Sequence, residues 1–300
     1  MTRVWLKALA AALALTCAGF AAAQTTPAEL TGTLRKVRDS GSITIGFRES
    51  SIPFSYLSAR GEPIGYSIDL CRLIVDAIGE EFGRTIALKW QPVTSETRIE
   101  AVRSGAVDLE CGSTTNNLER AKLVSFSPTI FVSGTKLLVR KGSPIKSFRD
   151  LDGKTVVVTA GTTNQKAMRD LAQKFKLNLN LPATPDHAAS FELLANGKAD
   201  AFATDDVLLY GLLAQRKLQG EYVVTGEFLS YDPYGIMFRK GDGQLAALIN
   251  DTFRQLAEDR ELERRYERWF LRRLPSGQSI DLPMSPQLDS IFRSLGALPE

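Results

Sequence analysis

The stretch SGAVDLECGSTTNNLER, residues 104–120, is the strongest single indication of the fold. It begins with a helix end of the form Gly-x-x-Asp and continues into a short apolar strand and a polar loop. NGKAD at residues 196–200 repeats that beginning and leads into a second strand. Strand and helix patterns alternate around both copies, which indicates α/β layers on mostly parallel sheets. The repeat fits two lobes of similar build.

The expected elements follow from the spacing of apolar residues and from turn and cap signals. Strands are expected at residues 42–46, 86–92, 107–111, 155–159 and 199–203. Helices are expected at residues 68–82, 98–104, 163–175, 191–196 and 245–270. We expect the last helix to pack back on the first lobe, so the chain crosses between the lobes more than once.

The N-terminus has the order of a secretory signal peptide, with Arg3 and Lys7 before an uncharged apolar run that ends in small residues. We expect cleavage after Ala23 and a periplasmic mature protein. A retained anchor and a lipid attached at Cys17 are the alternatives. Cleavage lowers the lysines plus arginines from 37 to 35, against 34 acidic residues. A nearly neutral chain offers no basic field for nucleic acid.

Two cysteines, Cys71 and Cys111, remain after the expected cleavage. An oxidising compartment permits a disulfide between them. Cys71 lies in a helical pattern and Cys111 at a strand end, however, and we favour two buried free thiols. The chain has one histidine and no Cys-x-x-Cys pair, so neither a metal nor a cofactor is expected.

Candidate binding residues follow the expected strands, where ligands sit in open α/β sheets. Arg98 lies in the first turn of a helix that we expect Ser95 to cap. The helix dipole disfavours a cation there, so a carboxylate partner, which suits the guanidinium fork, would explain the placement. A solvated surface arginine is the alternative. Ser113 and Thr115 follow another strand, before a helix that we expect Asn116 to cap.

Two further helix starts follow strands in the second lobe. TAGTT at residues 159–163 precedes a helix whose first amide groups attract anions, but no P-loop lysine follows, so a nucleotide is not expected. Thr184 and Pro185 signal a helix start that places His187 in the first turn. A bound anion there would help the imidazole to stay protonated, and a solvated or capping histidine is the alternative.

Charged residues also follow the first strand and the strand at residues 199–203. Arg48 is a second guanidinium at a strand end, and nearby aromatic residues could form an apolar wall. Asp205 and Asp206 follow the later strand, where a carboxylate could hold an ammonium group. A turn is the nearest alternative for this pair of acids.

Read as a set, these segments resemble the periplasmic glutamate/aspartate-binding proteins of amino-acid ABC importers, in solute-binding protein family 3. The likeness runs in order from about residue 42 to residue 270. It is carried by RESSIPFSY, GYSID, TSETRI, ECGSTTNNLERAK, TIFVSGTKLL, VVVTAGTT, DHAASF and TDDVLLYG.

The resemblance implies an α/β, type II periplasmic-binding-protein fold, in which two strands cross between two lobes. Lobe 1 would comprise residues 24–131 and 235–300, and lobe 2 residues 132–234. The crossings would lie near residues 131–135 and 231–235. The mature protein would be a monomer that works with the membrane subunits of an ABC importer.

The resemblance also implies how the amino-acid backbone of a ligand is held. Arg98 would clamp the α-carboxylate, supported by Ser113, Thr115 and Thr163. Asp205, together with Ser113, would receive the α-ammonium group. Hydroxyl groups from both lobes would complete this shell when the lobes close.

The side-chain carboxylate of the ligand would be addressed by Arg48, Ser95 and His187. Arg120 would orient the loop at residues 113–115 or reach the ligand. One departure is Phe47, which stands where family members often have histidine. Because side chains alternate along an extended segment, we expect Phe47 to point away from Arg48 and to have little effect on recognition.

The predicted function is therefore capture of L-glutamate or L-aspartate outside the cytoplasmic membrane for delivery to an importer. The enzyme alternative is a dehydratase on the same fold, similar to periplasmic cyclohexadienyl dehydratases. It would need an acid or base that is not used in ligand anchoring, and Asp206 is the one candidate. The third alternative, the ligand domain of a sensor, lacks any recognisable signalling module in this sequence.

Overall fold

The structure is a computed structural model that describes residues 29–297. The predicted signal peptide at residues 1–23 and the alternative lipid site at Cys17 lie outside the described residues. Among the described residues, none of the helices is both long and apolar enough to cross a membrane.

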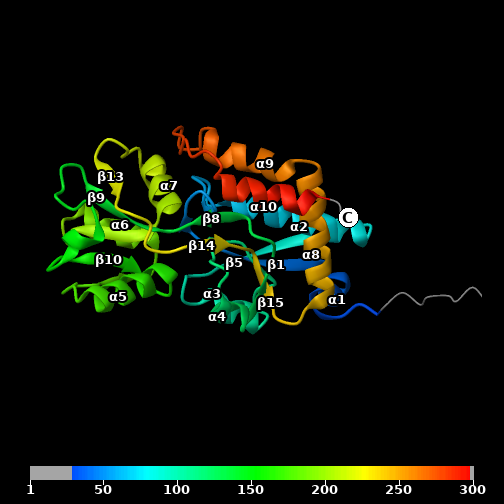
Figure 1. Ribbon diagram of the computed structural model, residues 1–300. Helices are drawn as coiled ribbons and strands as arrows, with labels where there is room; N and C mark the ends of the chain where they lie inside the picture. The colour runs from blue at the N-terminus through cyan, green and yellow to red at the C-terminus, as the bar shows by residue number, and fades with distance from the viewer. Residues whose placement is uncertain (1–28, 298–300) are drawn as a thin grey trace, which may run out of the picture. The chain divides into compact units, whose positions relative to one another are not determined.

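The strands and helices alternate along the chain (Figure 1). The strands are β1 (Ser42–Phe47), β2 (Ser50–Ser51), β3 (Ser55–Leu57), β4 (Pro63–Ile64), β5 (Ala87–Pro92), β6 (Leu109–Glu110), β7 (Val124–Phe126), β8 (Phe131–Ser133), β9 (Thr135–Arg140), β10 (Val156–Thr159), β11 (Ala183–Thr184), β12 (Ala201–Asp205), β13 (Tyr222–Thr225), β14 (Asp232–Tyr234) and β15 (Met237–Arg239). The helices are α1 (Gly32–Ser40), α2 (Tyr66–Glu81), α3 (Arg98–Arg103), α4 (Leu118–Ala121), α5 (Thr163–Phe175), α6 (His187–Ala195), α7 (Asp206–Arg216), α8 (Gly243–Glu258), α9 (Glu261–Tyr266) and α10 (Pro286–Gly296), with a 3-10 turn η1 (Phe148–Leu151) and a π turn η2 (Glu267–Leu271).

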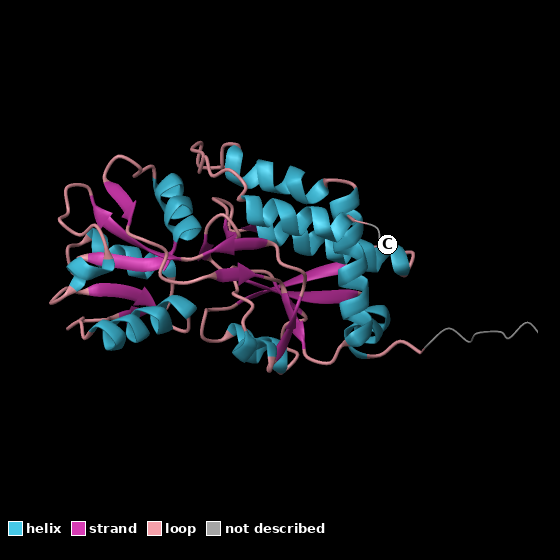
Figure 2. Cartoon of the chain, viewed as in Figure 1, coloured by secondary structure: helices cyan, strands magenta, loops and turns pink. Residues whose placement is uncertain are grey.

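Two five-stranded sheets share one topology, with orders β5-β1-β6-β15-β7 and β11-β10-β12-β9-β13. In each sheet the first three strands are parallel and the last two are joined by antiparallel pairing. Helices flank the strands of both sheets (Figure 2). Between the sheets, β8 and β14 pair antiparallel, with Phe131 opposite Tyr234 and Ser133 opposite Asp232 (Figure 1). The α/β architecture expected from the sequence is therefore present.

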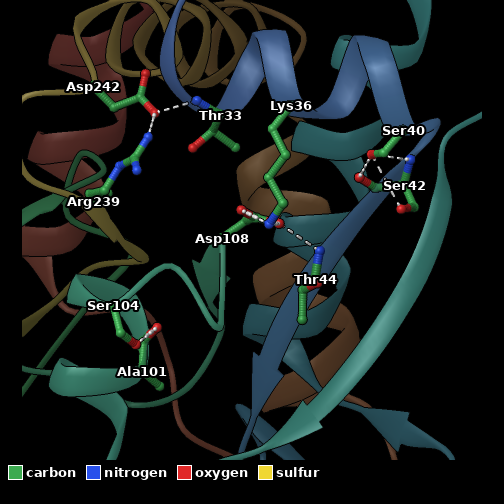
Figure 3. Close-up of polar contacts among 10 residues, drawn as sticks. All are labelled: Thr33, Lys36, Ser40, Ser42, Thr44, Ala101, Ser104, Asp108, Arg239 and Asp242. Atoms are coloured by element: carbon green, nitrogen blue, oxygen red, sulfur yellow. Dashed lines mark hydrogen bonds and ion pairs between the residues drawn. The ribbon is translucent and has the colours of Figure 1, made fainter.

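The Gly-x-x-Asp repeat makes the same contacts in both sheets. Gly105 and Gly197 end their helices with positive φ, at 78° and 68°. Asp108 then hydrogen-bonds Thr44 at the start of β1, its Oδ2 accepting from Thr44 N at 2.9 Å (Figure 3). Asp200 does the same to Thr155 before β10, with Oδ2 accepting from Thr155 N at 2.8 Å. Each aspartate thereby fastens the first residues of the neighbouring parallel strand.

The first helix is tied to the same end of the first sheet. Lys36 on α1 forms an ion pair with Asp108 at 2.8 Å, and Thr33 N donates to Asp242 Oδ2 at 2.8 Å (Figure 3). Asp242 also caps α8 by accepting from Leu245 N. Helix α8 also contacts α1 and α2. The C-terminal helical region thus packs on the first lobe, as expected.

The single helix expected at residues 245–270 is wrong, since α8 ends at Glu258 and α9 begins at Glu261. Arg260 takes a left-handed conformation with φ of 57° and breaks the helix. The break lets Tyr266 and Phe270 stack on Phe131 of β8. Packing of this aromatic cluster therefore overrides a helical pattern that carries no glycine or proline at the break.

The preference for two free thiols is also wrong, because Cys71 and Cys111 form a disulfide. Their Cα atoms lie 6.3 Å apart, within the usual range for a bridge, and both residues are buried. Cys71 lies on α2 and Cys111 directly follows β6. The bridge depends on how α2 packs on the sheet, which the spacing of the two residues in the sequence does not reveal.

Candidate functional site

A pocket lies beyond the carboxyl ends of the parallel strands. It is lined by Arg48, Ser95, Arg98, Ser113, Thr115, Thr162, Thr163, Asn164, His187, Asp205 and Leu208. The parallel strands of both sheets end in segments that supply this lining, as the rule for open α/β sheets predicts. Every predicted site residue except Arg120 lies in the pocket wall.

Arg48 and Arg98 are both buried, with 2% of each exposed. Arg98 Nη1 donates to Thr114 Oγ1 at 2.6 Å and to Ser113 O at 3.3 Å. Arg98 Nε and Arg48 Nη1 are buried and have no hydrogen-bond partner among residues 29–297. Burial and then repulsion from Arg98 lower the pKa of Arg48 to about 9, and burial lowers the pKa of Arg98. Two guanidinium groups thus retain donor capacity in a desolvated wall, where an anion would be paired and hydrogen-bonded.

Ser95 lies in the pocket wall but does not cap a helix, contrary to expectation. The helix α3 begins at Arg98 itself, with Thr97 at the cap position. Thr94 and Thr97 instead satisfy each other's backbone and hydroxyl groups in the preceding turn. The buried Ser95 hydroxyl has no partner among the described residues.

Arg120 connects the two lobes beside the pocket. Its Nη1 donates to Thr115 O at 3.0 Å and its Nη2 to Gly161 O at 3.3 Å. These contacts correspond to the first predicted role, orientation of the loop at residues 113–115. Asn117, not the expected Asn116, caps the helix that carries Arg120, because its side chain accepts from Arg120 N.

His187 is buried at the first position of α6. The expected start at Thr184 and Pro185 is two residues early, because Asp186 is the cap and accepts from Ala189 N. His187 Nδ1 is 2.8 Å from Thr159 Oγ1. Burial, Arg48 and Arg98 together lower the pKa of His187 well below 6.5, so the imidazole is neutral at neutral pH.

Asp205 is buried at the carboxyl end of β12 and faces the pocket. Its Oδ1 accepts from Asn164 Nδ2 at 2.7 Å, and its Oδ2 accepts from the hydroxyl of Tyr234. Burial and then the nearby Asp232 raise the pKa of Asp205 to about 8. Helix α7 begins directly at Asp206, so the turn considered for this pair of acids is wrong.

Comparisons with known proteins show the family to which the chain belongs. Residues 43–272 match the model of the bacterial extracellular solute-binding proteins, family 3. The chain belongs to this family. It is 43% identical over 269 residues to the L-glutamate/L-aspartate-binding protein of Pseudomonas aeruginosa, covering 89% of each chain. It is 39% identical to the glutamate/aspartate import solute-binding protein of Escherichia coli, covering 94% of each.

Solved structures of binding proteins share the fold. A mutant of ArgBP from T. maritima superposes with a TM-score of 0.71 at 27% identity, covering 80% of this chain and 100% of that chain. An ancestral amino acid-binding protein, a precursor of cyclohexadienyl dehydratase, gives 0.70 at 28% identity, covering 79% and 99%. The type II periplasmic-binding-protein fold expected from the sequence is confirmed.

This family 3 protein belongs with extracellular solute-binding proteins, and the relatives reported above are solute-binding proteins and not enzymes. Asp206, the candidate for a dehydratase, accepts hydrogen bonds from Ser133 Oγ and Val207 N and does not line the pocket. Phe47 packs edge to face on Trp90 and is also absent from the pocket wall.

Several polar residues of this family 3 site were missed in the sequence. Asn164 and Tyr234 hold Asp205, while Asp232 accepts from Thr115 Oγ1 at 2.9 Å. Thr114 and Glu110 stand behind Arg98. For Asn164 and Glu110, the one signal in the sequence is their position in the chain. Asn164 follows Thr163 at a helix start, and Glu110 ends a short strand.

Proposed function

We propose that this protein captures L-glutamate or L-aspartate in the pocket between its lobes and delivers it to an ABC importer. The observation that carries the proposal is the convergence of Arg48 and Arg98 on one pocket, each with a buried nitrogen that lacks a partner within the described chain. An acidic amino acid has two carboxylates and one ammonium group, and the pocket offers two guanidinium groups and Asp205.

The residue roles follow from this charge match. Arg98, Ser113, Thr115 and Thr163 would bind the α-carboxylate, with the first amide groups of α5 beside it. Asp205 and Ser113 would receive the α-ammonium group. A carboxylate held this way is both paired and hydrogen-bonded, which offsets its loss of hydration.

The side-chain carboxylate would lie among Arg48, Ser95 and His187. A neutral side chain such as that of glutamine would leave Arg48 without its anion, at a cost of roughly 2–5 kcal/mol. Arg120 would act from outside the pocket by holding the loop of Thr115 against Gly161.

The cellular setting is also part of the proposal. The apolar N-terminal run at residues 8–23 would direct export to the periplasm and be removed. Lobe 1 would comprise residues 24–131 and 235–300, and lobe 2 residues 132–234, with hinges at the β8 and β14 pair. The protein would act as a monomer, and the membrane subunits of the importer would recognise its closed, ligand-bound conformation.

Calorimetric titration with L-aspartate, L-glutamate, L-asparagine and L-glutamine tests the proposal. We expect dissociation constants of about 1 μM or below for the two acids, and at least about 30-fold weaker binding of the amides. Arg48→Gln should weaken binding of the acids and leave the amides unaffected, whereas Arg98→Gln should weaken all four. Absence of saturable heat with both acids would refute the proposal.

A further inference from the structure

Glu110 is a fully buried acid next to the site but outside its wall. It ends β6, the middle strand of the first sheet, and pairs with Gly46 on one side and Met237 on the other. Its backbone is therefore fixed on both edges. Its Oε2 accepts from Thr114 Oγ1 at 2.7 Å, and its Oε1 has no partner among residues 29–297.

A hydroxyl group connects Glu110 to Arg98. Thr114 Oγ1 accepts from Arg98 Nη1 at 2.6 Å and donates its own proton to Glu110 Oε2. Because one hydroxyl serves both groups, the carboxylate polarises the contact that holds Arg98 Nη1. Arg98 Nε is buried and has no hydrogen-bond partner in the described chain.

Gly112 brings Glu110 close to Arg48. A Cβ atom at Gly112 would collide with Glu110 Oε1 and would come within 3.0 Å of Arg48 Cγ. The absence of a side chain there leaves room for the carboxylate to lie beside the stem of Arg48. Glu110 thus faces both arginines, and its negative charge offsets their repulsion and the cost of their burial.

We propose that Glu110 is the internal counter-charge of the site, which holds Arg48 and Arg98 in the ligand-free protein and limits the positive charge that they present to an anionic guest. This role rests on the proposed function only for the effect on affinity. The effect on the ligand-free protein follows from the burial of two like charges and needs no particular ligand.

Glu110→Gln removes the charge and leaves an amide oxygen that can accept from Thr114. We expect the melting temperature of the ligand-free protein to fall by roughly 3–8 °C, because two buried guanidinium groups lose their counter-charge. Affinity for L-glutamate should rise by about 3–10-fold at low ionic strength, because the dianionic guest meets more positive charge. A residue with a merely structural role would lower stability and affinity together.

Two further variants complete the experiment. Glu62→Gln makes the same change of charge at an exposed position of the same lobe and should alter neither property. Glu110→Gln combined with Arg48→Met removes one charge of each sign and should melt higher than Glu110→Gln alone. Differential scanning calorimetry without ligand measures this rescue. If Glu110→Gln folds poorly, the double variant still tests the proposal, because it should regain stability.

The outcomes separate the two proposals. If the natural chain binds neither acid, the proposed function fails, while the ligand-free melting temperatures still test Glu110. The proposal for Glu110 is overturned if Glu110→Gln melts like Glu62→Gln, if it binds glutamate more weakly than the natural chain, or if the double variant melts no higher than Glu110→Gln.

Discussion

Asp205 has a pKa of about 8, because burial and the neighbouring Asp232 both favour its protonated form. In the unfolded chain the same group titrates near 3.8. Between these values the folded protein holds a proton that the unfolded chain has lost. The free energy of unfolding of the ligand-free protein therefore falls as pH rises through this window. An ammonium group beside Asp205 would favour its ionised form and so offset the cost of ionising a buried carboxyl group. Binding of the ligand is therefore coupled to release of the proton from Asp205.

Asp205→Asn removes this pH dependence. The amide can still accept from Asn164 and can donate to the hydroxyl of Tyr234, so we expect the ligand-free protein to gain about 1–3 kcal/mol at pH 8 and little at pH 4. Urea unfolding at both pH values measures the difference. Asp76→Asn, at an exposed position of α2, is the control. It should leave the difference in the free energy of unfolding between pH 4 and pH 8 unchanged. An equal gain at pH 4 and pH 8 would contradict the titration of Asp205.

The identity of the residues in the pocket wall was predicted more completely than their protonation states. Arg48 and Arg98 follow strand ends and Asp205 is the last residue of β12. The topology of the sheets brings such ends together whatever the detailed packing. The neutral state of His187 was not foreseen, because it arises from burial and from the two guanidinium groups, which are distant in the sequence. Tyr234 lies on β14, which pairs antiparallel with β8 between the two sheets and is not one of the parallel strands, so the same reasoning overlooked it.

Asp108 and Asp200 perform the same task in elements of the same design, yet their surroundings differ. Asp108 is 5% exposed and also pairs with Lys36, whereas Asp200 is exposed and bonds Thr155 N. A buried hydrogen-bonded charge contributes more than one that water can replace. The repeated motif therefore predicts the contact but not its strength.

Asp108→Ala should lower the free energy of unfolding by about 2–3 kcal/mol, because it removes a buried carboxylate that both accepts from Thr44 N and pairs with Lys36. Asp200→Ala should lower the free energy of unfolding by about 0.5–1 kcal/mol, because Asp200 is exposed and water can replace its carboxylate. Chemical denaturation of the two variants gives the comparison directly. Equal losses would show that exposure does not distinguish the two contacts.

Local signals predicted elements well and long-range packing poorly. Gly105 and Gly197 mark helix ends by their positive φ, and the strands that follow were expected. The break at Arg260 and the disulfide between Cys71 and Cys111 depend on which surfaces meet after folding. Neither the left-handed conformation of Arg260 nor the Cys71–Cys111 disulfide has a local sequence signal. They could therefore not be predicted from a single segment of the chain.

The two lobes contact each other beside the pocket. Thr115 Oγ1 on the first lobe lies 3.2 Å from Thr163 Oγ1 on the second, and Arg120 reaches Gly161 O. Gly161 lies so close to Glu96 that a Cβ atom would stand 2.9 Å from Glu96 N and Cα. The atoms nearest to a Cβ atom at this glycine all belong to Glu96 on the opposite lobe.

Gly161→Ala should therefore impair closure more than folding. Gly161 and Gly197 have φ of +70° and +68°, but nothing lies within 4 Å of a Cβ atom at Gly197, so Gly197→Ala is the matched control. Both variants should lose about 1 kcal/mol of stability through backbone strain. Only Gly161→Ala should bind L-glutamate about tenfold or more weakly, because its methyl group holds the lobes apart. Calorimetry gives the affinities and X-ray scattering with saturating ligand gives the radius of gyration, and equal affinities in the two variants would contradict closure against Glu96.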